Sequence, residues 1–135
     1  MLIRKHIAII GGGPAGLRAA EVASAGGAKV TLYESMRSVG RKFLVAGKSG
    51  LNLTNGENIS EFFTKYDGEG LPDEHWREII SSFDNTALRE WAASLGIETF
   101  VASSGKVFPS PVGGNIKAAP LLRRWIIRLR EMGVV

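Results

Sequence analysis

Residues 7–16 read IAIIGGGPAG, and this stretch decides the fold of the chain. Its first four residues form a short apolar, β-branched run, which is typical of a strand buried on both faces of a parallel sheet. The next six match G-x-G-x-x-G and open a segment of helical character at residues 14–25. Gly11 permits a tight strand-to-helix turn, Gly13 leaves room for a pyrophosphate, and Gly16 lets the helix pack closely on the sheet. Because the motif follows a strand and opens a helix, it predicts a dinucleotide-binding βαβ unit.

The expected phosphate-binding residues are those of the turn. Their free N–H groups and the positive end of the helix face an anion. A second strand is predicted at residues 29–34, and it ends in Glu34, 23 residues after Gly11. A carboxylate there accepts hydrogen bonds from the adenosine ribose and disfavours a 2′-phosphate, which argues against NADP. The predicted cofactor-binding residues of this part are Gly11, Gly12, Gly13, Pro14, Ala15, Gly16 and Glu34.

The remaining sequence predicts helices and one hairpin. Residues 35–57 are rich in Gly, Asn and Ser and are predicted as loop. Three helices are expected next, capped by Asn58, by Asp73 and by Asp84 or Asn85. A hairpin with its turn at 103–105 follows, and a final helix is expected from about Ala119 to Met132. The fold class is therefore α/β: a Rossmann-like FAD/NAD(P)-binding domain with a parallel sheet and a small β-hairpin.

Composition excludes several other classes of site. The 135 residues include no Cys, which excludes a disulfide framework or a thiol nucleophile and favours a cytoplasmic protein. His6 and His75 are isolated, so no metal site is predicted. No apolar stretch approaches the length of a membrane span. The net charge of +4 is spread along the sequence, and its densest cluster lies on an amphipathic segment that is expected to be a solvated helix face, so no nucleic-acid partner is predicted. This cluster consists of Arg123, Arg124, Arg128 and Arg130.

A second glycine-containing motif lies at residues 40–55, which read GRKFLVAGKSGLNLTN. Its GKS triplet at 47–49 imitates a P-loop, but G-x-x-x-x-G-K-S requires glycine where the chain has Lys42. The triplet also follows no strand directly. The P-loop interpretation is therefore rejected.

Residues 7–55 as a whole resemble the BaiN/YhiN-like family of NAD(P)/FAD-dependent oxidoreductases, in the glutathione-reductase-type FAD class. The resemblance continues through GKVFP at 105–109 and KAAPLL at 117–122. The commoner pattern of the family is GGGRCNxTN, whereas this chain is similar to a divergent GKSGLNLTN branch. The departures remove the Arg and the Cys of the commoner pattern, so no role is carried over from them.

The resemblance implies that FAD is the cofactor and that Arg41, Lys42 and the loop at residues 47–55 approach its flavin half. The residues implied are Arg41, Lys42, Ser49 and Asn52. The loop offers hydrogen bonds to the flavin ring, while the redox chemistry belongs to the cofactor. NAD is a candidate electron donor, and the substrate is not identified. Two alternatives remain open: an NAD-binding domain of a dehydrogenase, and a non-catalytic dinucleotide-binding module.

The order of elements also predicts a fragment. Residues 133–135 resemble the start of a third strand, and no later strands of a doubly wound sheet follow them. The first strand would then have an unpaired edge, which favours self-association. We therefore expect residues 1–135 to be the N-terminal part of an FAD-binding domain that binds FAD weakly and has no turnover by itself.

Overall fold

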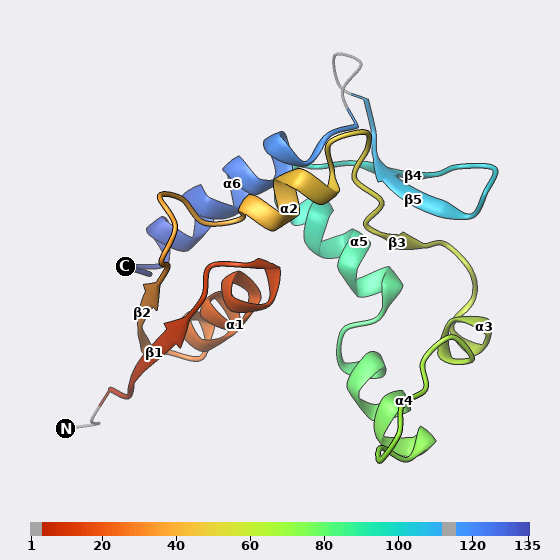
Figure 1. Cartoon of the computed structure of the whole chain (residues 1–135), viewed down its shortest axis with the longest axis horizontal. Helices are drawn as coiled ribbons and strands as arrows, with labels where there is room; N and C mark the ends of the chain where they lie inside the picture. Colours follow the sequence, from red (N-terminus) through yellow and green to blue (C-terminus); the bar gives the residue numbers. More distant parts are fainter. Residues whose placement is uncertain (1–3, 112–115) are drawn as a thin grey trace. The chain divides into compact units, whose positions relative to one another are not determined.

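The computed structural model describes residues 4–111 and 116–135, and the chain divides into two compact units. Residues 1–49 and 117–135 form the first unit, and residues 50–116 form the second. Figure 1 shows the elements in chain order. The first unit contains β1 (His6–Ile10), α1 (Pro14–Ala25), β2 (Lys29–Tyr33), α2 (Arg41–Ala46) and α6 (Ala118–Glu131). The second contains α3 (Ile59–Phe63), α4 (Asp73–Ser82), α5 (Asn85–Ser94), β3 (Thr54–Asn55), β4 (Thr99–Val101) and β5 (Lys106–Pro109).

The first unit is built on the predicted parallel strand pair. β1 and β2 run parallel, with Ile7 opposite Val30 and Ile9 opposite Leu32. The other edge of β2 is used as well, because Val135 accepts a hydrogen bond from the Leu32 N–H (2.7 Å) and donates one to the Val30 carbonyl (3.2 Å). The backbone N–H and carbonyl groups of residues 30 and 32 point away from β1, toward the other edge of β2. Residues 133–135 thus reach the place predicted for a third strand.

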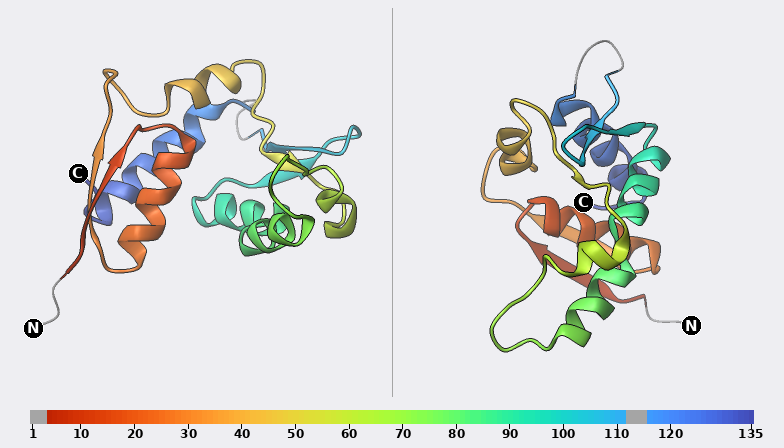
Figure 2. Two further views of the ribbon diagram at one scale, coloured as in Figure 1. Left: turned by 60° about the horizontal axis from the view of Figure 1, so that its bottom comes forward. Right: turned by 90° about the vertical axis from the view of Figure 1, so that its right-hand side faces the viewer.

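Two helices cover one face of this sheet. α1 and α6 lie side by side there (Figure 2). Their shared core contains Leu17, Val30, Leu121 and Leu129, all buried. The small α2 packs on α6 through an edge-to-face contact of Phe43 with Trp125, at 6.3 Å between ring centroids. The packing explains why Trp125 is core, as its helical spacing predicts.

The prediction that β1 is buried on both faces is wrong. Four of its five residues are exposed, and Ile10 is 82% exposed. Within the described residues β1 pairs only with β2, and its second face carries no helix of its own unit. The apolar run specifies a strand, but the neighbours of that strand determine its burial.

The second unit joins a small antiparallel sheet to three helices. The predicted hairpin of β4 and β5 is confirmed, and β3 pairs with the free edge of β5, giving the order β3-β5-β4. Asn85, at the start of α5, is buried and donates through Nδ2 to the carbonyls of Asn55 and Glu57, both at 2.8 Å. These bonds tie the helix to the segment around β3.

Several helix ends agree with prediction and others do not. Asn58 and Asp84 cap α3 and α5 through their side chains, accepting from the N–H groups of Glu61 and Ala87. Asp73 is instead the first residue of α4, whose N-cap position is Pro72. The prediction of 35–57 as loop is wrong in two places, because α2 and β3 form there. No helix in the described part of the chain is long and apolar enough to cross a membrane.

Candidate functional site

The glycine-rich turn between β1 and α1 has the geometry that its sequence predicts. Gly11 has φ +99°, a conformation that side chains rarely adopt, and its N–H donates to the Tyr33 carbonyl at 2.7 Å. A Cβ added at Gly16 would lie 1.9 Å from the Gly11 carbonyl oxygen. Gly16 therefore allows helix α1 to start directly against the turn.

Gly13 leaves an open space at the start of α1. It is the N-cap residue of the helix, with φ −77°, and a Cβ added there would meet nothing within 4 Å. Backbone N–H groups in the first turn of a helix have no carbonyl partner within the helix. Pro14 has no N–H, so the donors of this end are the amides of Gly13, Ala15 and Gly16. The open space and these donors fit a phosphate group.

The acid at the end of the second strand is joined directly to this turn. The N–H of Gly12 donates to Oε2 of Glu34 at 2.8 Å, and the N–H of Met36 donates to Oε1 at 2.8 Å. The two backbone bonds fix both carboxylate oxygens. Oε1 also accepts from the Ser35 hydroxyl at 3.4 Å, so Oε2 is the oxygen that keeps a further lone pair for a ligand hydroxyl. Because Glu34 accepts the Gly12 amide, the phosphate donors expected in the turn are the amides that follow it.

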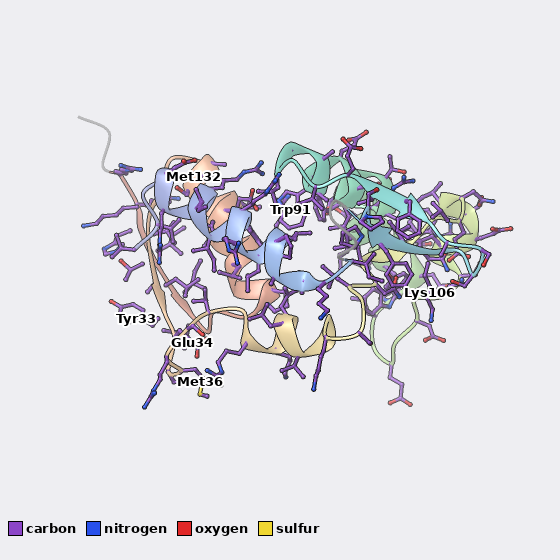
Figure 3. All side chains as sticks on the ribbon, turned by 90° about the horizontal axis from the view of Figure 1, so that it is seen from above. Tyr33, Glu34, Met36, Trp91, Lys106 and Met132 are labelled. Carbon is purple, nitrogen blue, oxygen red and sulfur yellow. The ribbon has the colours of Figure 1, made fainter. Side chains whose placement is uncertain are left out.

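The same bonds set the charge state of Glu34. The Met36 N–H has the largest effect and the Gly12 N–H the next, and both lower the pKa of the Glu34 carboxyl below its ordinary value. Desolvation of the carboxyl raises the pKa and offsets only part of this effect. Glu34 is therefore ionised at neutral pH and accepts hydrogen bonds from both sides. Figure 3 shows it next to Met36 beyond the end of β2.

Two residues that the sequence did not point to hold the turn from the other side. Gly40 donates its N–H to the Gly12 carbonyl at 2.7 Å, and a Cβ added at Gly12 would lie 2.5 Å from Cγ1 of Val39. Gly40 itself has φ +72°, with Leu122 where its Cβ would be. Residues 39–40 thus hold the glycine-rich turn in place. The sequence signal for this contact is Gly40, the first residue of the second glycine-containing motif.

The structure brings together the six turn residues and Glu34, whereas the four residues expected near the flavin are divided between the two units. Arg41 and Lys42 are exposed on α2, and Ser49 is exposed at the end of the first unit. Asn52 is exposed in the second unit. Gly47, the glycine of the GKS triplet, follows helix α2 as its C-cap, which agrees with the rejection of a P-loop.

The charge of the chain is divided between the units. The first unit contains 13 Lys and Arg residues against 3 Asp and Glu residues, and the second contains 4 against 10. Two of the three acids of the first unit are already engaged, because Glu21 is paired with arginines and Glu34 holds backbone amides. Basic residues thus occur along the whole sequence, as expected, but their excess over acidic residues is confined to the first unit. The glycine-rich turn lies in a strongly basic unit, and such a charge attracts anionic ligands.

A parallel βαβ unit whose turn meets an acid from the neighbouring strand is characteristic of Rossmann-type dinucleotide-binding domains. The described residues contain no group of three or more His, Asp or Glu side chains arranged to hold a metal ion. The chain belongs to the HI0933-like protein Rossmann domain family, whose profile matches residues 5–135. This confirms the family resemblance of its sequence.

One curated relative is a 3-dehydro-bile acid delta(4,6)-reductase from Clostridium scindens. It is 35% identical over 131 residues, which cover 96% of this chain and 30% of the relative. The chain thus spans about a third of the length of this relative.

Proposed function

We propose that the chain binds the ADP half of FAD and is the cofactor-binding portion of a flavoprotein oxidoreductase. The observation that carries this proposal is the hydrogen bond between the Gly12 N–H and Oε2 of Glu34, 2.8 Å long. It joins the two parts of the fingerprint, the phosphate turn and the ribose acid, into one site.

The residues present fit an ADP group. A diphosphate would accept hydrogen bonds from the Gly13, Ala15 and Gly16 amides at the positive end of α1. The ribose hydroxyls would donate to Glu34, whose lowered pKa keeps it an acceptor. A 2′-phosphate would place negative charge against the same carboxylate, so the site favours FAD or NAD over NADP.

Family membership favours FAD over NAD, and the relative named a reductase supports a redox role. We place Arg41, Lys42, Ser49 and Asn52 near the flavin half in the complete protein, where Arg41 and Lys42 would supply positive charge and the other two hydrogen bonds. The flavin supplies the electron-pair transfer when it is bound. NAD as the electron donor remains a proposal.

Calorimetric titration of the purified chain with FAD, ADP, NAD and FMN tests the proposal. FAD, NAD and ADP contain the adenosine diphosphate group and should bind, whereas FMN lacks it and should not. A Gly13→Val variant should lose binding of all three while keeping the wild-type circular dichroism spectrum, because nothing lies within 4 Å of the added Cβ. Gly26→Ala, at the far end of α1 and with only ordinary contacts for its Cβ, is the control and should bind normally.

Binding of FMN but not ADP would contradict the proposal, and so would unchanged affinity in Gly13→Val. The flavin assignment has its own test in the complete protein, purified with its native cofactor. A flavin absorption spectrum is expected, and a bound nicotinamide without flavin would favour a dehydrogenase. Bound FAD without turnover with any reductant would favour a non-catalytic module.

A further inference from the structure

We propose that the side chain of Met36 packs against the face of the adenine ring of the bound dinucleotide. The inference rests on the proposed function, because it takes the ribose to bind at Glu34. It adds a residue that lies outside the glycine-rich turn and its acid.

The direction of the nucleotide follows from the two oxygens of Glu34. Oε2 accepts from Gly12, in the phosphate turn, and Oε1 accepts from Met36, beyond the end of β2. A ribose on this carboxylate has its 5′ carbon and phosphates on the side of the turn. Its C1′ atom, which carries the base, is at the opposite end of the sugar. The base therefore extends toward residue 36.

Met36 has a surface that suits a base. Its side chain is 55% exposed although it is large and apolar, and the residues around it in sequence, Ser35, Arg37 and Ser38, are polar and exposed. A thioether makes favourable contacts with aromatic rings and adapts to their shape. The Met36 backbone is held by its 2.8 Å hydrogen bond to Oε1 of Glu34, so the Cα atom that carries the side chain lies next to this carboxylate. Figure 3 shows Glu34 and Met36 adjacent, and Met132 at a distance from both.

Tyr33 is the other exposed ring-binding candidate at this end of the strand, also with 55% exposure. It lies opposite Ile10 in the sheet, on the face that α1 does not cover. Tyr33 is the last residue of β2, and its carbonyl accepts the Gly11 N–H, whereas the Met36 N–H is bound to the Glu34 carboxylate itself. A ribose bound to Glu34 therefore has Met36, and not Tyr33, beside its base.

The test uses the whole chain labelled with ¹³C in the methionine methyl groups and ¹⁵N in the backbone. On titration with ADP, the Met36 methyl signal should move upfield through the ring current of adenine, while the Met132 methyl signal stays in place. Assignment comes from the loss of one signal in Met36→Leu. Inorganic pyrophosphate, which has no base, should shift the amides of Gly13 and Ala15 and leave the Met36 methyl unchanged.

Affinity provides a second measurement. Met36→Ala should weaken ADP binding about two- to tenfold, the range of a sulfur–aromatic contact, and should leave pyrophosphate binding unchanged. Met36→Leu keeps the apolar volume and should restore most of the affinity.

The outcomes separate this inference from the proposed function. If ADP shifts the Gly13 and Ala15 amides but not the Met36 methyl, the adenine contact is wrong and the phosphate site stands. If pyrophosphate alone moves the Met36 methyl, the shift reports a loop rearrangement, and the contact is again wrong. If ADP shifts neither group, the proposed function fails and the inference fails with it.

Discussion

The indole Nε1 of Trp125 donates a hydrogen bond of 2.9 Å to Oε2 of Glu21, joining α6 to α1. Glu21 is only 6% exposed, and its carboxylate also accepts from Arg18 and Arg128, each at 3.1 Å. A buried carboxylate is tolerated only when it is paired and hydrogen-bonded, as this one is. The bond connects the helix of the phosphate turn to a helix about a hundred residues later in the chain.

Glu21→Ala should therefore destabilise the first unit by on the order of 3 kcal/mol, because it removes the buried acceptor that the Trp125 indole, Arg18 and Arg128 share. Glu21→Gln keeps an acceptor for the indole and should cost less. Urea unfolding followed by circular dichroism measures both. Equal stability of Glu21→Ala and wild type would contradict the structural role of the carboxylate.

Replacement by alanine should lower the stability of the protein at Gly16 but not at Gly13, although both glycines belong to one motif. Gly16→Ala places a Cβ 1.9 Å from the Gly11 carbonyl, a backbone atom that cannot move without opening the turn, so a loss of about 3 kcal/mol or more is expected. Gly13→Ala has open space and an ordinary φ, so its thermal midpoint should match that of wild type. The measurement is thermal unfolding of the three proteins side by side. Similar midpoints for both variants would show that the close packing at Gly16 is not required.

Binding at Glu34 should depend on pH in one direction. Since the backbone amides lower the pKa of this carboxyl in the folded chain, ADP affinity should stay constant above the ordinary range of a glutamate and fall only as pH drops below it. The native contribution of Glu34 to stability is lost in the same acidic window. Glu34→Gln should weaken ADP binding about tenfold at neutral pH and remove most of the acidic dependence. A full pH dependence in that variant would place the titrating group elsewhere.

The excess of basic residues in the first unit predicts salt-sensitive binding of phosphates. Exposed charges are screened over about 8 Å at physiological ionic strength, so the affinity for pyrophosphate should fall as salt rises. Adenosine, which has no charge, should bind with an affinity nearly independent of salt. Parallel titrations at low and high sodium chloride test this. Equal salt dependence of the two ligands would contradict electrostatic attraction by the unit.

The sequence predicted those features that neighbouring residues determine. The strand–turn–helix–strand order, the caps by Asn58 and Asp84 and the hairpin turn before Lys106 all depend on local chemistry, and the structure confirms them. The missed elements depend on distant partners. α2 has six residues and is held by Phe43 on Trp125, while β3 has two residues and exists through its pairing with β5.

The same distinction between local and distant interactions applies to the candidate site. The roles of Gly11 and Gly16 can be read from the motif, because they arise within the turn itself. The motif does not predict the contact of Gly12 with Glu34, nor the contacts of Gly12 with Val39 and Gly40. These contacts bring together residues more than twenty positions apart. For the same reason, the hydrogen bond from the Gly12 amide to the carboxylate is visible only in the structure.

The hydrogen bonds that Glu34 accepts from Gly12 and Met36 have a consequence for the entropy of binding. The acid and both neighbouring backbone segments are held by hydrogen bonds within the protein, so a ligand does not have to immobilise them. Amide hydrogen exchange would register this as slow exchange at Gly12 and Met36 in the free protein. The amides of Gly13 and Ala15, which have no carbonyl partner in the first turn, would become slow only when an anion arrives. In the proposed complex, the part held by Glu34 would bind the ribose, and the unpaired amides at the start of α1 would bind the phosphates.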